Sequence, residues 1–562
     1  MDQKPQYILG LSYFGNHESA AALLKDGRLV AAAEEERFSR IKFDRSFPTH
    51  AIKFCLDYAD ITIHDISHVG FFWQPWRGIP RRILHALSGL PSSLSRSYRN
   101  MGVLHDLLFA KRIFAQKTGY RGPFHFINHH ATHAASVYFT SGFERSALIT
   151  IDGTGERKSC TIGKAEGNTF TRYKTTLWPH SLGHVYAAAT QHLGFKILED
   201  EYKVMGLSAY GKPEYLDEFR KIIKSKLGSF EIDLRYTDYQ YFKERWYSNK
   251  WVERFGPARL PHEPINQHHK NIASSLQVRL QEVLFDLASY ATKQSGPLPL
   301  CIAGGVALNS LAMGKLAEQH IAKEIFVNPV SSDAGCALGA AFYIHHVLLN
   351  NGSPERLKHA YWGIEYSYQE IEEALTQAKV SYELLDNPSK TAAHLISEGH
   401  IIGWFQGRAE FGPRALGNRS ILADPRNAKI KDSINAKIKH RESFRPFAPA
   451  ILEEFQAEYF DSHTPVPFMT EVHVIKKEVQ SKVPAVVHVD GTARLQTVNR
   501  QTNPLFWDVI DEFYTITGIP LVLNTSFNAS GEPIVNSPHD AIKTFLKTNL
   551  DYLIIGKYLI KR

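Results

Sequence analysis

Two histidines with helical spacing are the first residues of this sequence that could carry chemistry. The stretch FINHHATHAASVYF, residues 126–139, contains His129, His130 and His133. Residues four apart share one face of an α-helix, so His129 and His133 can converge on one metal ion while His130 points elsewhere. Imidazole binds zinc, iron, nickel and copper well. The spacing alone is a weak signal, because an alanine-rich helix can carry surface histidines at the same interval.

Carboxylates at two later strand ends strengthen the metal hypothesis. The apolar stretch ALITI delivers Asp152 to a turn, and Asp333 follows another predicted strand in EIFVNPVSSDAG. Two imidazoles with one or two carboxylates form a metal site with open positions. A rival pair, His180 and His184, is also four apart, but a helix start with incidental histidines explains that pair better.

A basic segment points to a second kind of site. Residues 408–445 contain ten lysines and arginines against four acidic residues. Guanidinium groups match phosphate oxygens with paired hydrogen bonds, and here they are interleaved with Phe, Pro and Gly, unlike a solvated helix face. The segment therefore predicts a compact pocket for a phosphate-bearing anion, formed by Arg414, Arg419, Lys439, Arg441 and Arg445.

Turns that follow predicted strands are further candidates for binding phosphate or nucleotide. GGVALN, residues 304–309, lets the backbone approach a ligand, although a tight strand–helix turn explains its glycines equally well. LVLNTSFNASGEP, residues 521–533, ends an apolar strand in amides and hydroxyls, which fit phosphate, ribose or ordinary Asx and Ser turns. The residues concerned are Gly304, Gly305, Asn309, Asn524, Thr525, Ser526 and Asn528.

The elements that would position these residues follow a repeated plan. Strands at 7–13 and 20–25, the turn Asp26-Gly27 and a returning strand form one hairpin unit. ALITIDGTGE, residues 147–156, opens a similar unit with its own hairpin near Gly167. Two such units predict a duplicated core, in which loops lie close to phosphates as in the fold shared by actin, sugar kinases and Hsp70. Helical periodicity dominates 268–293 and 310–323.

Composition is that of a folded protein with two or three domains. The chain has 562 residues, of which 43% are hydrophobic and 22% charged. It lacks an apolar run of 18 residues and a secretory pattern, and its four cysteines form no CxxC pair, so we expect a cytoplasmic protein. The net charge of +8 admits nucleic acid or a phosphate-bearing small molecule as partner. A polar stretch at 349–363 predicts domains 1–355 and 365–562.

Nine stretches resemble the O-carbamoyltransferase family that includes the nodulation-factor, cephem and tobramycin carbamoyltransferases. They occur in family order over nearly the whole chain, and several are long. They are GLSYFGNHESAAALLKDGRLVAAAEEERFSRIK, HHATHAAS, TIDGTGE, EYKVMGLSAYGKPE, CIAGGVALNS, SSDAGCALGAA, GRAEFGPRALGNRSILADPR, RPFAPAIL and LVLNTSFNASGEPIV.

The resemblance implies two modules and a two-step reaction. The first would be an α/β module like the tRNA threonylcarbamoyl-transferase domain, on the actin/Hsp70-type fold. The second would be an α+β YrdC-like module, whose Lys-x-Arg and Ser-x-Asn signatures are matched by Lys439–Arg441 and Ser526–Asn528. In such enzymes the second module makes carbamoyl-adenylate and pyrophosphate from ATP and carbamoyl phosphate. In the first module an acceptor hydroxyl then takes the carbamoyl group and AMP leaves.

The family pattern also implies roles for individual residues. A divalent metal, usually iron, would be held by His129, His133, Asp152 and Asp333. Nucleotide and phosphate binding, with Mg²⁺ accompanying ATP, would fall to Gly153, Thr154, Gly304, Gly305, Asn309, Arg414, Arg419, Arg494, Asn524, Thr525, Ser526 and Asn528. Charge developing during adenylate formation would be steadied by Lys439, Arg441 and Arg445. His17, in the NHES loop, is the candidate base or acceptor contact, with an ordinary turn histidine as the alternative.

Two other functions compete with O-carbamoyl transfer. A tRNA threonylcarbamoyl enzyme would fit the positive charge, but the GPRALG block and the two-module order favour a small hydroxylated acceptor. A non-catalytic nucleotide-binding scaffold would leave the basic segment without a purpose. We therefore expect neither nucleic acid nor a membrane as partner, and the relatives allow a homodimer. The choice of acceptor should lie in residues 70–120 and 228–265, which match no family motif and contain Trp73, Trp76, Arg77 and Trp246.

Overall fold

The computed structural model describes residues 4–14, 18–88, 90, 94–242, 244–442 and 444–562, in two compact units. The first unit comprises residues 1–35 and 43–357, and the second comprises residues 36–42 and 358–562. The stretch between Leu348 and Tyr368 contains neither helix nor strand. The short segment 36–42 belongs to the second unit, which no sequence pattern indicated.

The two predicted hairpins of the first unit are confirmed. Strands β2 (Ala20–Lys25) and β3 (Arg28–Glu34) pair antiparallel around a two-residue turn. Asp26 and Gly27 both have positive φ, at 49° and 80°, which is the backbone that a type I′ turn requires. The second hairpin joins β7 (Lys158–Glu166) to β8 (Thr169–Leu177) through Gly167, whose φ is 53°.

The two sheets of the first unit have the same strand order, so the predicted duplication is confirmed. The first sheet runs β3-β2-β1-β4-β5 and the second β8-β7-β6-β11-β12. In each, the hairpin strands are antiparallel and the later strands are parallel to the central one. The remaining strands are β1 (Tyr7–Ser12), β4 (Ile66–Phe71), β5 (Phe124–Phe126), β6 (Arg145–Ile151), β11 (Leu300–Ala303) and β12 (Ile325–Val327).

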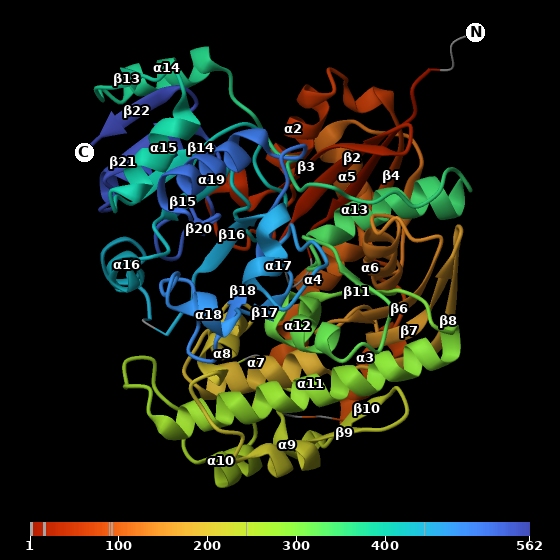
Figure 1. The fold of residues 1–562 in the computed structure, drawn as a ribbon. Coiled ribbons are helices and arrows are strands. Elements are labelled where there is room, and N and C mark those ends of the chain that lie inside the picture. Colours follow the sequence, from red (N-terminus) through yellow and green to blue (C-terminus); the bar gives the residue numbers. More distant parts are fainter. Residues whose placement is uncertain (1–3, 15–17, 89, 91–93, 243, 443) are drawn as a thin grey trace. The chain divides into compact units, whose positions relative to one another are not determined.

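Two helices are exchanged between these sheets. α6 (His129–Tyr138) follows the first sheet but packs on β6 and β11 of the second, whereas α13 (Gly335–Phe342) follows the second sheet but packs on β1, β2 and β4 of the first. Glycines permit this closeness, because a Cβ on Gly10 of β1 would lie 1.9 Å from the carbonyl oxygen of Ala337. The helices also pack on each other (Figure 1). The exchange brings together the segments that carry the predicted metal ligands.

Other helices of the first unit cover the sheets and form the regions without family motifs. α11 (Gln267–Ser295) packs along β6 and β7, and α2 (Thr49–Tyr58) packs on β2 and β3 (Figure 1). The remaining elements are α3 (Ile79–Ser88), α4 (Leu94–Leu108), α5 (Ala110–Thr118), α7 (Leu182–His192), α8 (Glu201–Ser208), α9 (Leu216–Ile222), β9 (Ile223–Ser225), β10 (Phe230–Ile232), α10 (Asn249–Phe255) and α12 (Ser310–Glu318).

The second unit is built on a mixed sheet with the order β13-β22-β21-β14-β15-β20-β16-β19. Its apolar core combines side chains of these strands with helices α14 (Tyr368–Gln377), α15 (Pro388–Ser397), α19 (Pro504–Thr517) and α20 (Pro538–Lys547). The strands are β13 (Glu383–Leu384), β14 (Ile402–Phe405), β15 (Arg419–Ala423), β16 (Ala448–Leu452), β19 (Gln496–Val498), β20 (Leu521–Ser526), β21 (Tyr552–Ile555) and β22 (Tyr558–Lys561).

Smaller elements complete the second unit. α16 (Ala428–Ser433) continues into a π-helical turn over Ile434–Ile438, directly before Lys439. A separate two-stranded ribbon pairs β17 (Val472–Val474) with β18 (Thr492–Arg494), and α1 (Glu36–Ser39), α17 (Gln456–Tyr459) and α18 (Lys477–Gln480) are short.

Candidate functional site

The helix that carries the histidines is held at its first residue by a buried carboxylate. α6 begins at His129, whose backbone N–H donates to Oε1 of Glu156 at 2.9 Å. The Asn128 side chain donates to the other oxygen of Glu156 at 2.5 Å. Glu156 is 1% exposed and thus supplies the acceptor that the first turn of a helix needs. No local pattern indicates this cap, because Glu156 lies 27 residues after His129, beyond β6.

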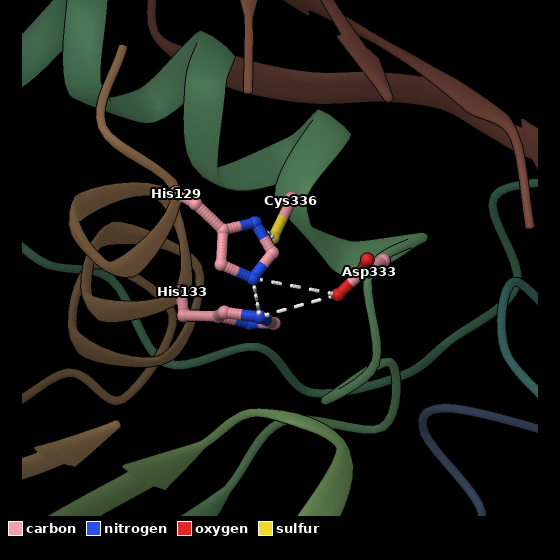
Figure 2. Close-up of side chains that lie close together, drawn as sticks. All are labelled: His129, His133, Asp333 and Cys336. Atoms are coloured by element: carbon pink, nitrogen blue, oxygen red, sulfur yellow. Dashed lines mark hydrogen bonds and ion pairs between the residues drawn. The ribbon is translucent and has the colours of Figure 1, made fainter. Parts of the chain in front are cut away.

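Four buried side chains converge in front of α6. Nε2 of His129 lies 3.1 Å from Nε2 of His133 and 3.1 Å from Oδ2 of Asp152. Oδ1 of Asp333 lies 3.6 Å from Nε2 of His129 and 3.5 Å from Nε2 of His133. Figure 2 shows both imidazole nitrogens and the Asp333 carboxylate facing one point. The structure therefore brings together all four residues that the sequence and the resemblance indicated.

This arrangement fits a divalent metal. Bonds of about 2.1 Å to one ion at tetrahedral or octahedral angles place neighbouring ligand atoms about 3.0–3.4 Å apart, close to the separations here. Oδ1 of Asp333 is buried and accepts no hydrogen bond within the described part of the chain. A buried carboxylate oxygen without a donor is costly, and a cation removes that cost. Imidazole and carboxylate together suit iron or zinc.

Cys336 is a fifth buried group at the centre, and sequence reasoning missed it. Ligand atoms of His129, His133, Asp333 and Cys336 all lie within 4.8 Å of one another. The sulfur is 4.0 Å from Nδ1 of His129, the ring nitrogen that faces away from His133 and Asp333 (Figure 2). Asp152, in contrast, lies on the Nε2 side. Cys336 and Asp152 thus contact opposite nitrogens of the His129 ring.

The pKa values of His129 and His130 are shifted in opposite directions. Burial alone would lower the pKa of His129, but the charges of Asp333 and Cys336 outweigh it and raise the pKa to about 10. His130 behaves in the opposite way, because burial and then the charges of His129 and His133 lower its pKa well below the usual value. Its ring is hydrogen-bonded to Oγ1 of Thr150 at 2.7 Å and to the Lys158 carbonyl at 3.1 Å. His130 is a core residue.

Glycine turns hold Asp152 in place. The backbone N–H of Gly305 donates to Oδ1 of Asp152 at 3.0 Å. Gly304 has φ +103°, and a Cβ there would lie 2.1 Å from the Ile151 carbonyl oxygen, so only glycine fits. The carbonyl of Gly153 accepts from Oγ of Ser181 at 2.6 Å. Both predicted glycine turns thus border the centre.

Asn309 and Thr154 are already engaged in local hydrogen bonds. The Asn309 amide pairs with Gln277 at 2.9 and 3.0 Å, and its oxygen also accepts from the N–H of Ala312 at the start of α12. Oγ1 of Thr154 donates to the Gly155 carbonyl at 3.0 Å.

The rival histidines, His180 and His184, have hydrogen-bond partners other than the metal candidates, although a Cβ on Gly153 would lie 3.0 Å from Nε2 of His184. Nδ1 of His184 accepts from the indole N–H of Trp178 at 3.3 Å, and Nδ1 of His180 accepts from the N–H of Ile232 at 3.1 Å. Trp246 packs edge-on to His184, with ring centroids 4.9 Å apart. His17 lies outside the described residues.

Aromatic side chains from the 70–120 region border the centre. The Trp73 ring lies 5.1 Å from that of His129, and the Phe72 ring lies 5.6 Å away, centroid to centroid. Trp73 is 6% exposed, whereas Trp76 is 51% exposed and packs against Phe126. The segment in which we expected acceptor choice therefore begins beside the candidate metal site.

In the second unit, the two predicted signatures meet at one buried lysine. Nζ of Lys439 donates to Oδ1 of Asn528 at 2.7 Å and to the Asn528 carbonyl at 3.0 Å, and it also contacts the carbonyl of Ser526. Lys439 is 3% exposed. Burial lowers its pKa well below the usual value, and the charges of Arg441 and Arg445 lower it further.

Several arginines crowd the same region. We call Arg414, Lys439, Arg441, Arg445 and Arg494 the basic cluster. Burial lowers the pKa of Arg494 well below the usual value, and the neighbouring Arg414, Arg441 and Arg445 add to the effect. Nε of Arg494 is buried without a hydrogen-bond acceptor among the described residues. Glu442 forms an ion pair with Arg445 at 3.8 Å. Guanidinium groups match phosphate oxygens with paired hydrogen bonds, and mutual repulsion among these cations favours an anion beside them, so the cluster is suited to binding phosphate.

Two predicted anion-binding residues form hydrogen bonds within the second unit. Arg419 is fully buried and donates to the carbonyls of Gln406 and Gly407, at 2.6 and 3.0 Å, while its guanidinium lies 3.7 Å from the centroid of the Phe405 ring. Asn524 is buried and donates to Oε1 of Gln496 at 2.8 Å. Thr525, its neighbour in β20, is opposite Ile421 of β15 in the sheet.

The chain is similar to known proteins over most of its length. Two family models match it, "Carbamoyltransferase N-terminus" over residues 7–342 and "Carbamoyltransferase C-terminus" over residues 393–562. Nodulation protein NolNO of Sinorhizobium fredii is 39% identical, over 97% of this chain and 79% of its own. Nodulation protein NolO of Bradyrhizobium diazoefficiens is 41% identical, over 78% and 79%. An uncharacterized Synechocystis protein is 37% identical over 99% of this chain and 97% of its own.

A membrane-crossing helix is not found in the part of the chain that the structure describes, since none there is both long and apolar enough.

Proposed function

This chain belongs to the carbamoyltransferase family, and from that premise we propose that it is an ATP-dependent O-carbamoyltransferase acting on a hydroxyl of a small molecule. Family membership makes it a transferase of carbamoyl groups. The ATP requirement, the two-step route, the placement of each step and the acceptor class are the proposal.

The basic cluster is the observation that carries the proposal. Carbamoyl phosphate and ATP are both polyanions, and both must lie close together for an adenylate to form. Arg414, Arg441, Arg445 and Arg494 supply the positive charge, and Lys439 is fixed between Ser526 and Asn528. Lys439 of the Lys-x-Arg signature thus contacts both ends of the Ser-x-Asn signature. This contact supports the proposal that the second unit is YrdC-like.

The adenylate-forming step balances with one water. Carbamoyl phosphate, ATP and water give carbamoyl-adenylate, pyrophosphate and phosphate. Water first cleaves the bond between the carbamoyl group and the phosphate of carbamoyl phosphate, which releases phosphate and leaves carbamate. An oxygen of the carbamate then bonds to the α-phosphorus of ATP while the bond from that phosphorus to the oxygen bridging the α- and β-phosphates breaks, which releases pyrophosphate. Negative charge grows on the departing pyrophosphate, where fixed guanidinium groups stabilise it more than they stabilise the ground state. Mg²⁺ would accompany the ATP phosphates.

The first unit would receive the adenylate. Its duplicated sheets support an actin/Hsp70-type fold, in which glycine turns contact the nucleotide. Here the turns at Gly153, Gly304 and Gly305 border the metal candidates. The Asn309 amide is already paired with Gln277. We therefore propose that Asn309 contributes to nucleotide binding by capping the first turn of α12.

His129, His133, Asp152 and Asp333 would hold the divalent metal, with iron as the proposed ion. When bound there, the ion would supply Lewis-acid polarisation of the adenylate. The chain's own residues orient this chemistry: the Gly305 N–H donates to Asp152, Cys336 contacts His129, and the Trp73 ring packs beside the His129 ring. In the transfer, the acceptor oxygen bonds to the carbamoyl carbon, AMP leaves, and the hydroxyl proton passes to a base, for which His17 is the candidate.

Pyrophosphate release tests the proposal. Full-length protein is incubated with ATP, Mg²⁺ and carbamoyl phosphate, and pyrophosphate and AMP are measured. We expect pyrophosphate to form and Arg441→Ala to abolish it, whereas Arg500→Ala, at an exposed arginine, retains it. The proposal is overturned if the protein releases no pyrophosphate even when hydroxylated acceptors and metal are added. Pyrophosphate formed only with bicarbonate and threonine would identify a tRNA-modifying threonylcarbamoyl enzyme instead.

A further inference from the structure

The short segment Glu36–Lys42 leaves the first unit and joins the second. It follows β3 directly and precedes α2, yet it groups with residues 358–562. Arg37, which is 4% exposed, donates to the carbonyl of Gly412 at 2.5 Å. Arg40 has φ +61°, and a left-handed backbone is unfavourable at a non-glycine residue, so the contacts made by the segment must hold it there.

The guanidinium of Arg40 binds three acceptors around one loop of the second unit. Nη1 donates to the carbonyl of Ile534 at 2.6 Å, and Nη2 donates to the carbonyl of Pro533 at 2.9 Å. Nε lies 3.3 Å from Oδ1 of Asp540, with which Arg40 forms an ion pair. Because a guanidinium presents its donors in a rigid planar fork, the three contacts fix these acceptors relative to one another.

The carboxylate of Asp540 also caps α20. Its Oδ2 accepts from the backbone N–H groups of Asn536 and Ser537 at 3.2 and 2.9 Å. Oγ of Ser537 accepts from the N–H of Asp540 at 3.1 Å, which completes a capping box. Arg40 thus joins the loop that precedes α20 to the first turn of that helix.

The same loop carries the last residue of the Ser-x-Asn signature. We call residues 527–536, which connect β20 to α20, the Asn528 loop. The loop is closed by the N–H of Val535, which donates to the carbonyl of Phe527 at 2.9 Å. Within it, Nδ2 of Asn528 donates to the carbonyl of Glu532 at 2.7 Å. The Asn528 side chain is therefore oriented by the stretch of backbone that directly precedes the carbonyls bound by Arg40.

Lys439 takes its hydrogen-bond acceptors from this loop and from the strand before it. Its Nζ donates to Oδ1 and to the carbonyl of Asn528, at 2.7 and 3.0 Å, and contacts the carbonyl of Ser526. Lys439 is 3% exposed, and a buried ammonium without acceptors is costly. The position of the ammonium therefore depends on the shape of the Asn528 loop.

We propose that Arg40 is a positioning residue of the second unit, which holds the Asn528 loop in the shape that keeps Lys439 in place. Arg40 binds the carbonyl of Pro533. The preceding carbonyl, of Glu532, binds Asn528, which in turn binds Lys439. The use of Lys439 in adenylate formation rests on the proposed function, whereas this path of contacts does not.

Hydrogen exchange tests the path of contacts without any activity. Exchange of the backbone amides in peptides covering residues 527–536 is followed by mass spectrometry in the full-length protein. We expect exchange there to be faster by about tenfold or more in both Arg40→Met and Arg40→Gln, because the loop opens more often. Amides of β14, in the core of the second unit, should exchange as in the wild type. Arg500→Met, at an exposed arginine, controls for the loss of one positive charge.

A double-mutant cycle on pyrophosphate release then tests the positioning role. We expect Arg40→Met and Asn528→Ala each to lower kcat/KM by about tenfold or more, since a small displacement of a positioned group is enough for such a loss. If Arg40 acts through Asn528, the double variant should be no slower than Asn528→Ala alone. A general loss of stability would instead lower the rate further in the double variant. Arg500→Met should keep wild-type kinetics.

Either of two results would overturn the inference on Arg40. One is wild-type exchange of residues 527–536 in both Arg40 variants. The other is a double variant in which the two losses of kcat/KM multiply, because the residues would then act independently. Wild-type protein that releases no pyrophosphate would refute the proposed function instead, and the exchange experiment would still decide whether Arg40 holds the Asn528 loop.

Discussion

Gly339 lies directly against the carbonyl oxygen of Thr132, at the point where α13 meets α6. A Cβ at position 339 would lie 1.9 Å from that oxygen and 3.1 Å from the backbone nitrogen of Ser136. α6 carries His129 and His133, and α13 begins just after Asp333. The closeness of this helix pair therefore sets the distance between the imidazoles and the carboxylate.

Gly339→Ala is expected to separate the two helices. The added methyl cannot fit without backbone movement, so the free energy of unfolding should fall by about 1–3 kcal/mol. Metal content, measured by elemental analysis after loading with Fe²⁺, should fall as well. Gly102→Ala is the control, because no atom lies within 4 Å of a Cβ there. A Gly339→Ala protein with wild-type stability and metal content would show that the contact is unimportant.

The three histidines should respond differently to replacement by alanine. His129→Ala and His133→Ala each remove a ligand and should abolish stoichiometric metal binding while pyrophosphate release continues. His130→Ala should retain the metal but lower the Tm, because Thr150 and the Lys158 carbonyl lose a buried hydrogen-bond partner. Elemental analysis and thermal unfolding of the three variants distinguish these roles. Unchanged metal content in His129→Ala would refute the ligand assignment.

Cys336→Ala should weaken metal binding without changing its stoichiometry. Loss of a group that orients a metal-binding histidine typically lowers metal affinity 10–100-fold. Competition with a chelator of known affinity measures the change. Cys301→Ala, at a buried cysteine of β11, should keep wild-type affinity. Complete loss of bound metal in Cys336→Ala would instead make the thiolate a ligand.

Replacement of Arg494 and of Arg419 should have opposite effects on stability. Arg494 is surrounded by like charges, so Arg494→Met should leave the Tm unchanged or raise it, while pyrophosphate release falls at least about 100-fold. Arg419→Met removes donors from several buried carbonyls and should lower the free energy of unfolding by about 3 kcal/mol. Both are measured by thermal unfolding without ligands. A Tm shift in the same direction for both would contradict the distinction.

Local patterns in the sequence predicted much of the first unit. The Asp26-Gly27 turn defines its hairpin because few residues adopt positive φ twice in succession. His129 and His133 share a helix face by spacing, and Asp152 and Asp333 follow strands, so their convergence required only that the strand ends meet at one edge.

Residues whose role depends on tertiary packing were not predictable in the same way. Arg419 and Asn524 have the chemistry of ligand-binding residues, but backbone carbonyls and Gln496 engage them. Cys336 contacts His129 only because α13 packs on α6. The transfer of Glu36–Lys42 to the second unit depends on carbonyl groups some 375 to 494 positions away in sequence, which no local pattern encodes.

The exchange of α6 and α13 has a consequence for how the protein is synthesised. The strands of the first sheet have all emerged by Phe126, but the helix that covers β1, β2 and β4 begins at Gly335, 209 residues later (335 − 126). At roughly 5–20 residues per second, that sheet waits for about 10–40 s on the ribosome with an apolar face uncovered. A nascent chain interrupted in this interval would also have His129 and His133 without Asp333. The first unit can therefore be completed only late in translation.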